Sequence, residues 1–362
     1  MMPTLTTSYK TKPNTLLSRE AWVLGGLGVL LLVVILLSVS TGAVHISVEE
    51  IFAILLHKSG GPTEGFTAQK EVVLWSIRLP RVALGIFIGA ALAISGASLQ
   101  GLFRNPLVEP GLIGVSNGAA LCAIVVIVFS QSLPEQLAEV LGVYLLPFSA
   151  FIGSLVVTLL AYRLSQRHGK TDIALLILAG VAMNALAAAL IGLVIYYADD
   201  TALRTFTFWS LGDLGGASWQ KTGFSLVIIA VPVILLTLFH SQLDALALGE
   251  AEAGHLGINV ERIKYTVIIL SALAVGASVS MAGTISFVGL VVPHMIRSVF
   301  GPGHRLLLPA AILLGATLLT LADVLARTVV TPSEIPIGVI TALIGSPFFI
   351  FLLLQTKQRR MI

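Results

Sequence analysis

Charged residues are scarce in this sequence: Asp, Glu, Lys and Arg make up 11% of its 362 residues, whereas hydrophobic residues make up 56%. A water-soluble fold of this length cannot bury so much apolar side chain. The single cysteine, Cys122, excludes a disulfide framework and a cysteine metal cluster, and we expect neither a metal centre nor a cofactor. The composition predicts an all-α polytopic membrane protein.

Ten apolar runs are long enough to cross about 30 Å of hydrocarbon as helices. The first run is too long for a signal peptide and lacks a clear cleavage site, so we interpret it as a membrane helix. The eighth is short and contains Pro293. The expected spans are 22–40, 79–101, 111–130, 146–164, 173–197, 222–240, 264–282, 284–300, 306–326 and 337–355.

Lys and Arg are distributed unevenly between the two ends of these spans. With the N-terminus inside, the inside segments hold 14 of the 21 basic residues. The positive-inside rule therefore predicts that both termini are cytoplasmic. We expect a cytoplasmic tail over 1–21, a single transmembrane domain over 22–355 and a second cytoplasmic tail over 356–362, with no soluble domain.

Signatures of catalysis are missing. The tripeptide Gly-Lys-Thr at 169–171 resembles the end of a phosphate-binding loop, but Leu164 stands where that loop requires glycine. The chain is therefore not expected to hydrolyse ATP. HExxH and GxSxG motifs are also lacking, which argues against a membrane-embedded protease or esterase.

Two ionisable residues lie well inside expected spans, where charge is costly and a functional role is a candidate. Asp323 stands four residues before Arg327, so a structural salt bridge is the simpler interpretation. His294 is interpreted as a hydrogen-bonded packing residue. Because buried acids are so few, an ion-coupled secondary carrier is disfavoured.

Small residues recur at every fourth position of the second span and form one stripe of its helix. Such stripes let helices approach closely within a membrane. The pattern predicts a central helix, although the same stripe would also suit a dimer contact. Its members are Gly85, Gly89, Ala93, Ala97 and Gly101.

The stretch 95–118, SGASLQGLFRNPLVEPGLIGVSNG, is polar and rich in Gly and Pro for a membrane protein. Arg104-Asn105-Pro106 and Glu109-Pro110-Gly111 predict rigid turns between two helices. The charge count places the stretch inside, so we expect a tight cytoplasmic connection.

The sequence from 78 to 119, RLPRVALGIFIGAALAISGASLQGLFRNPLVEPGLIGVSNGA, resembles the permeases of ABC importers for iron siderophores, haem and cobalamin, the FecCD family. The resemblance continues in the family's order through 246–258, 282–297, 304–327 and 334–354. It implies a homodimer of ten-span permease subunits in the bacterial inner membrane. It also implies two cytoplasmic ATP-binding subunits, which hydrolyse the ATP, and a soluble substrate-binding protein.

The inside segment 243–263 alternates apolar residues, acids and glycines. This pattern predicts two short amphipathic helices joined at a glycine and lying against a partner. An ordinary solvated loop is the alternative. The family resemblance implies that the segment couples the permease to its ATPase, through Leu246, Leu248, Gly249, Glu250, Gly254, Leu256 and Gly257.

Three arginines lie on the predicted outside, where the charge rule disfavours them: Arg78, Arg81 and Arg327. Without a family resemblance, the three arginines are compatible with simple anchors at the membrane interface. In the family, the matching arginines pair with glutamates of the binding protein. The resemblance therefore implies that these three dock that partner.

The fifth and tenth spans line the transport pathway in the family. Small or soft uncharged residues on both spans suit a weakly binding wall for a large cargo. The competing interpretation is helix packing. The candidates are Ala179, Gly180, Met183, Asn184 and Ala187, with Gly338, Thr341, Ala342, Gly345 and Ser346.

The outside segment 196–219 resembles haem-importing members more than cobalamin importers. Its aromatic residues could face a flat apolar cargo, although interfacial aromatics are also common without a ligand. We therefore predict haem or a related iron chelate as the cargo, with a ferric siderophore or cobalamin as alternatives. The aromatic residues are Tyr196, Tyr197, Phe206, Phe208 and Trp209.

Overall fold

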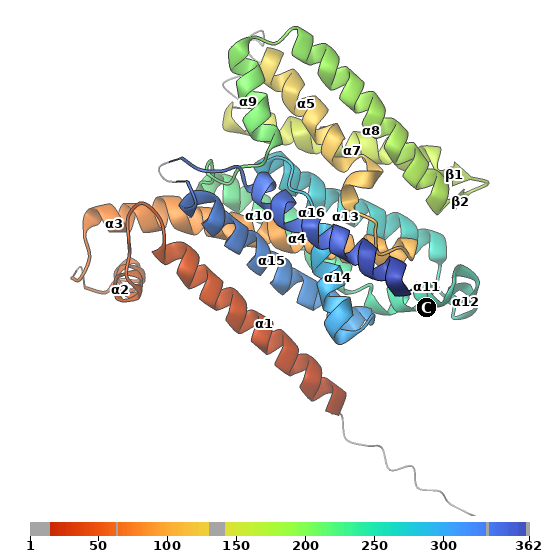
Figure 1. Cartoon of the computed structure of the whole chain (residues 1–362), viewed down its shortest axis with the longest axis horizontal. Coiled ribbons are helices and arrows are strands. Elements are labelled where there is room, and N and C mark those ends of the chain that lie inside the picture. Colours follow the sequence, from red (N-terminus) through yellow and green to blue (C-terminus); the bar gives the residue numbers. More distant parts are fainter. Residues whose placement is uncertain (1–14, 63, 130–141, 331–332, 360–362) are drawn as a thin grey trace, which may run out of the picture.

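The computed structural model describes residues 15–62, 64–129, 142–330 and 333–359, and these form a bundle of long helices (Figure 1). The first half contains α1 (Thr15–Ser40), α2 (Val48–Lys58), α3 (Ala68–Val72), the π-helical segment η1 (Val73–Arg78), α4 (Leu79–Phe103), the 3-10 turn η2 (Pro110–Ile113), α5 (Val115–Phe129), the 3-10 turn η4 (Gly142–Tyr144) and α7 (Leu145–Leu164).

A two-stranded antiparallel hairpin begins the second half. The elements there are β1 (Gln166–Arg167), β2 (Lys170–Thr171), α8 (Ile173–Tyr196), α9 (Asp200–Ser210), α10 (Trp219–Thr237), α11 (His240–Leu248), α12 (Glu250–His255), α13 (Val260–Ala282), α14 (Val288–Phe300), α15 (His304–Thr328) and α16 (Ile337–Arg359). The all-α polytopic architecture expected from the sequence is confirmed.

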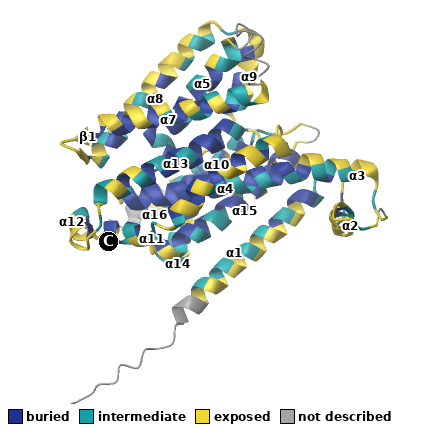
Figure 2. Ribbon diagram, turned by 180° about the vertical axis from the view of Figure 1, so that it is seen from behind, coloured by how far each residue is buried: buried dark blue, intermediate teal, exposed yellow. Residues whose placement is uncertain are grey.

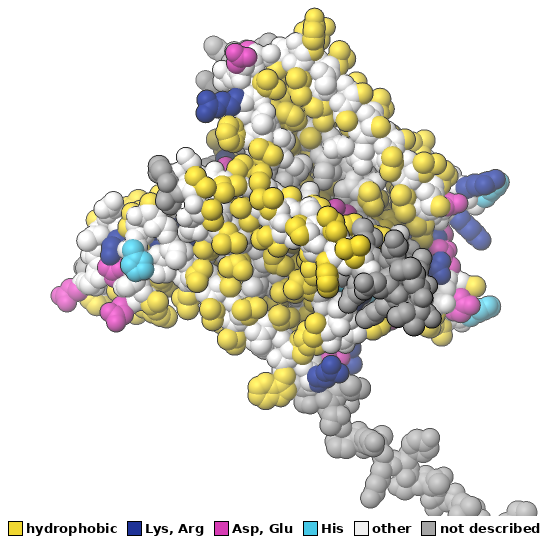
Figure 3. Space-filling model, viewed as in Figure 1, with side chains coloured by type: hydrophobic (Ala, Val, Ile, Leu, Met, Phe, Trp, Pro, Cys, Tyr) yellow, Lys and Arg dark blue, Asp and Glu magenta, His cyan; other side chains and the backbone are white. Residues whose placement is uncertain are grey.

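By length and composition, seven described helical segments are apolar enough to cross a membrane, and three shorter apolar helices occupy 115–129, 288–300 and 337–351. These ten segments match the ten apolar runs in order. Figure 3 shows broad apolar surface between two ends where most charged side chains gather. The number of spans, the domain limits and the cytoplasmic termini stay predictions, and residues 1–14 and 360–362 of the two tails lie outside the described chain.

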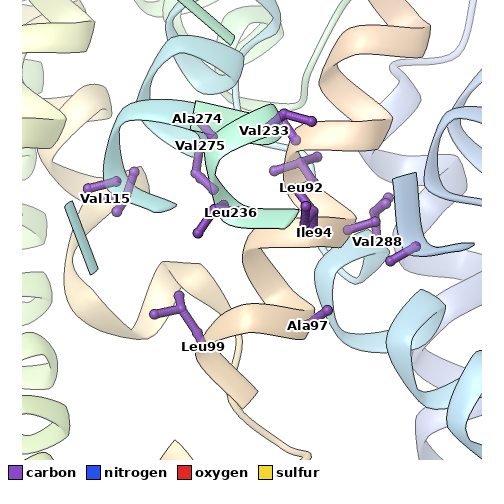
Figure 4. Packing of buried hydrophobic residues seen from close by; sticks show 14 of the residues in the cluster. Leu92, Ile94, Ala97, Leu99, Val115, Val233, Leu236, Ala274, Val275 and Val288 are labelled. Atoms are coloured by element: carbon purple, nitrogen blue, oxygen red, sulfur yellow. The ribbon is translucent and has the colours of Figure 1, made fainter. Parts of the chain in front are cut away.

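Helix α4 occupies the centre of the bundle, as the small-residue stripe predicted. It packs against α10, α13, α14 and α15, and Figure 2 shows it almost wholly buried. Figure 4 shows side chains of α5, α10, α13 and α14 around the side chains of α4. Gly89 lies so close to Gly315 of α15 that any Cβ there would meet the Gly315 backbone. The stripe therefore serves packing within the subunit.

The connection between α4 and α5 is not the simple cytoplasmic turn that we expected. Arg104 ends α4 in the left-handed conformation, with a φ of 50°, and 104–107 are exposed. The chain then returns into the bundle, where Val108, Pro110 and Ile113 are buried. The expectation of a surface turn was wrong for 108–110, and the start of the expected span 111–130 is a 3-10 turn instead of an α-helix. Side chains inside the bundle, Gln100 and Asn184, donate to carbonyls of this irregular segment.

The chain is also broken between α13 and α14. Gly283 has a φ of 71° and Phe287 a φ of 69°, and the residues between them are not helical. The N–H of Phe287 donates to the Glu109 carboxylate across 3.0 Å. Glu109 therefore joins the re-entrant 108–114 segment to this helix break. The expected span 284–300 becomes a shorter helix that begins at Val288.

Candidate transport groove and partner surfaces

A cavity of about 460 Å³ opens between α16 and the α13–α14 break. Its walls are small, hydroxylated or apolar, and no charged side chain lines it. Such a lining can contact a transported molecule without binding it strongly. The lining residues are Ser210, Leu211, Thr284, Ser286, Gly338, Val339, Ala342, Leu343, Ser346 and Pro347.

A second cavity, of about 180 Å³, shares Ser286 with the first. It is more polar and lies between the re-entrant segment, α5, α8 and α13. Asn184 of α8 donates from Nδ2 to the Gly111 carbonyl across 3.0 Å, and Asn117 donates to the Asn184 carbonyl across 3.3 Å. We call the two adjoining cavities the groove. Glu109, Ser116, Asn117, Asn184, Ser286 and Gly289 are among the lining residues of the second cavity.

The predicted pathway residues divide between this groove and the interior of the subunit. Gly338, Ala342 and Ser346 follow one face of α16 and line the larger cavity, and Asn184 lines the smaller one. Thr341 and Gly345 instead face inward, and Gly345 packs against Phe287.

On α8, three predicted residues face the interior. Ala179 and Ala187 are buried, and Gly180 contacts the Leu112 carbonyl of the re-entrant segment. Met183 is half-buried and packs against the main core. The exposed side of α8 carries larger residues, among them Leu178, Val181, Leu186 and Leu193. A role for the α8 and α16 residues in transport stays a prediction.

Sequence reasoning missed Glu109 as part of the groove, because it placed this acid on a surface turn. The carboxylate lines the 180 Å³ cavity, and its only described hydrogen bond comes from Phe287. A signal was present in the sequence: Glu109 stands in a Pro- and Gly-rich stretch between apolar runs. In transporters, interrupted hydrophobic segments of that kind often mark a binding region.

The segment 243–263 folds into α11 and α12, the two short helices that the pattern predicted. They meet at Gly249, whose φ of 139° is strained for other residues. Leu246 is buried in the main core and anchors α11, whereas Leu248 and Leu256 are 70% and 66% exposed. Glu250 begins α12, and Gly254 and Gly257 have open space around them. The two exposed leucines are the apolar groups available to a partner.

The three arginines predicted for docking are 5–9% exposed and have partners within the subunit. Arg78 donates to the carbonyls of Val39, Ser40 and Val44. Arg327 donates to the Thr41 carbonyl across 2.9 Å and to the backbone and hydroxyl of Ser38. The last carbonyls of a helix lack intrahelical donors and favour cations, so these arginines stabilise the C-terminal end of α1.

Arg81 belongs to the same buried network. It lies 2.8 Å from Asp323 and 2.8 Å from Glu334. Asp323 also pairs with Arg327 across 3.3 Å, which confirms the predicted salt bridge. Docking by Arg78, Arg81 and Arg327 stays a prediction, but their charges are engaged inside the chain.

His294 and the aromatic segment are also placed. His294 is half-buried and its ring packs edge-on against Phe348, with ring centroids 6.1 Å apart, as the prediction of a packing residue required. The predicted hydrogen bond is not found, since the ring makes none to a described residue. In the aromatic segment, Phe206 is buried and stacks on Trp209 across 6.2 Å. Tyr196 and Tyr197 are 82% and 67% exposed at the end of α8.

A polytopic helical bundle with a groove beside a helix break, whose larger cavity has no charged lining residue, is typical of a membrane transport subunit. The FecCD transport family model matches residues 30–355. The chain is 45% identical to the hemin transport system permease protein HmuU of Yersinia pestis, over 93% of this chain and 97% of that protein. It is 39% identical to the vitamin B12 import system permease protein BtuC of Citrobacter koseri, over 94% and 96% of the two chains.

A solved structure agrees with these relatives. A transporter assigned to the metal-chelate type of ABC transporters, in an inward-facing conformation, matches with a TM-score of 0.80 and 32% identity. The match covers 92% of this chain and 99% of that chain. The chain therefore belongs to the FecCD transport family, and it is the permease subunit of an ABC importer.

Proposed function

We propose that this permease moves haem, or a related iron chelate, across the bacterial inner membrane into the cytoplasm, using ATP hydrolysed by a separate subunit. The observation that carries the proposal is the groove, whose larger cavity has no charged lining residue and lies beside the break between α13 and α14. A bulky cargo that must be released again requires a wall that contacts it without holding it.

Haem is favoured over the other cargoes by the 45% identity to a hemin permease across nearly the whole chain. A ferric siderophore or cobalamin is the alternative, since BtuC relatives also match over most of their length. The exposed Tyr196 and Tyr197 offer flat apolar contacts at the end of α8, which suits a planar macrocycle.

The exposed faces of α8 and α16 suit a second copy of the chain. Leu178, Val181 and Leu186 on α8 and Leu343 and Ile344 on α16 are 46–66% exposed. Leu343 lines the larger cavity of the groove, and the other four lie on the two helices that carry groove residues. A homodimer would cover these faces and close the groove into a shared pathway. Because lipid supplies no hydrophobic driving force for helix association, the contact between the two copies would depend on close packing of these helices.

Two further partners complete the proposed importer. The exposed Leu248 and Leu256 around α12 would contact a cytoplasmic ATP-binding subunit, one for each permease copy. A substrate-binding protein would deliver cargo to the opposite side of the membrane. There, Arg78, Arg81 and Arg327 would act mainly by fixing the shape of the docking surface, because their guanidinium groups already have partners within the subunit.

The function is tested by reconstituting the permease with its ATPase and binding protein in proteoliposomes. We expect ATP-dependent uptake of haem in preference to ferric siderophores and cobalamin. Uptake that follows a proton or sodium gradient without ATP would instead identify a secondary carrier. Preferential uptake of cobalamin or a siderophore would keep the importer and overturn the cargo.

The groove is tested by single cysteines in a Cys122→Ala background. Ala342→Cys and Ser346→Cys place the thiol in the groove, and Thr341→Cys on the same helix is the buried control. We expect a water-soluble thiol reagent to modify the first two, at rates that change with ATP and vanadate, and to spare the third. Equal rates at all three positions in every state would place the pathway elsewhere.

A further inference from the structure

Lys264 near the start of α13 is 3% exposed and makes three polar contacts. Its ammonium group lies 2.7 Å from Glu250 of α12 and 3.2 Å from Glu261 of α13. It also donates to the Thr171 carbonyl across 2.9 Å. Because a buried ammonium is stable only with such partners, these contacts hold three separate segments together.

Thr171 is the last residue of the β1–β2 hairpin, immediately before α8. Its N–H donates to the second oxygen of Glu261 across 2.7 Å. Asp172 follows and caps α8 by accepting from the N–H of Leu175 across 3.0 Å. A displacement of Thr171 is therefore transmitted to the beginning of α8, the helix that carries Asn184 in the groove.

Helix α12 has few other attachments among the described residues. Only Ala253 of this helix is buried, and α12 joins α11 through Gly249, whose φ of 139° permits a sharp bend. The Glu250–Lys264 contact is therefore the main polar link between α12 and the rest of the bundle. A rotation of α12 about Gly249 would pull on Lys264.

We propose that Lys264 is a positioning residue that links α12 to the β1–β2 hairpin, so that a movement of α12 driven by the ATPase also displaces the start of α8. The proposal rests on the proposed function, in which α12 contacts the ATPase. It adds a specific route from that contact to the groove. The two segments move together because the same ammonium group binds both.

The link is tested first in the purified permease, without ATPase or cargo. Spin labels are attached at Lys170→Cys in the hairpin and His255→Cys in α12, both exposed, in a Cys122→Ala background. We expect the distance distribution between the two labels of one subunit to broaden in Glu250→Gln, since the ion pair with α12 is reduced to a weaker neutral hydrogen bond while Glu261 still neutralises Lys264. The matched control is Arg262→Gln, an exposed residue of the same turn. An unchanged distribution in Glu250→Gln would overturn the proposal.

The second measurement is cargo taken up per ATP hydrolysed by the assembled transporter. We expect this ratio to fall about fivefold or more in Glu250→Gln and in Lys264→Met, the lower limit of common coupling effects. Lys264→Arg should recover most of it, and Arg262→Gln should match the wild type. If Lys264→Met does not fold, Glu250→Gln alone decides the result.

The outcomes separate this link from the proposed function. Wild-type proteoliposomes that show no ATP-driven uptake would contradict the proposed function, whereas the spin-label distances would still decide the link. A normal ratio in Glu250→Gln, or a Lys264→Arg variant as impaired as Lys264→Met, would overturn the link and leave the importer standing.

Discussion

A single methyl group at Gly89 in α4 should destabilise the bundle, because α15 lies directly against this position. A Cβ at Gly89 would lie 2.8 Å from the carbonyl carbon of Gly315, closer still to its oxygen, and 2.9 Å from Cβ of Leu319. Backbone atoms of a neighbouring helix cannot rotate away as a side chain can. To bring the nearest of these atoms, the Gly315 oxygen, to an ordinary contact of 3.4 Å, α4 and α15 must separate locally by roughly one ångström.

Gly85, one turn earlier on the same stripe, provides the matched control. A Cβ there would lie 3.5 Å from Leu214 and 3.8 Å from Thr320, which are ordinary contacts. Both Gly→Ala changes share the gain in helix propensity, about 1 kcal/mol in water. The difference between the two variants therefore isolates the clash, and we expect Gly89→Ala to be less stable than Gly85→Ala by about 1–3 kcal/mol, the usual cost of overpacking.

The assay is unfolding in detergent micelles by increasing SDS, followed by far-UV circular dichroism. We expect the Gly85→Ala midpoint to equal or exceed the wild-type midpoint and the Gly89→Ala midpoint to fall below it. Equal midpoints for the two variants would refute the reasoning, because they would show that α4 and α15 separate without cost.

Three other changes test different contacts. Glu109→Ala leaves a part-buried N–H at the α13–α14 break without its acceptor and should lower the free energy of unfolding by about 1 kcal/mol, whereas Glu109→Gln keeps an acceptor and should lose less in the same SDS titration. Arg81→Ala breaks a buried ion pair with Asp323 and should cost up to about 3 kcal/mol, because Asp323 keeps only Arg327 as a cationic partner; Arg81→Lys keeps a cation there and should lose less in the same titration. Ser47→Ala removes the cap of α2 and should weaken that helix by about 1 kcal/mol, seen as faster hydrogen exchange over 48–58. Hydrogen bonds from Lys70 and from the Ser47 backbone lower the pKa of Glu50. The stabilisation of α2 by the Glu50 carboxylate is therefore complete at neutral pH and is lost as the pH falls through that lowered pKa. Hydrogen exchange over 48–58, measured as a function of pH, will show this loss.

The sequence alone was sufficient for the architecture, because the requirements of a membrane are local. Each apolar run must form a helix to satisfy its backbone, so run lengths predicted where the helices lie. The four-residue spacing of Gly85, Gly89 and Gly101 predicted a close approach of helices. The glycines of 243–263 likewise predicted two short helices, and the structure joins them at Gly249.

Tertiary structure decided which partner each residue contacts. The small face of α8 was predicted from spacing, but spacing cannot distinguish a face that lines a pathway from one packed on the same subunit. In the fold, Gly180 contacts the Leu112 carbonyl, whereas Ala342 and Ser346 of α16 line the groove. Both faces have the same composition because close packing and weak binding both require small, uncharged side chains.

The partners of the charged residues were even harder to predict from the sequence. Position in the sequence placed Arg78 and Arg327 on an outside surface, but the fold directs both toward the C-terminal end of α1, about 40 and 290 residues away in the chain. Glu109 and Lys264 likewise acquire their roles from partners on other helices. Apolar periodicity therefore determined the helices of this protein, whereas the contacts of its few polar groups depended on how those helices pack, since a buried charge is stable only where distant segments bring it a partner.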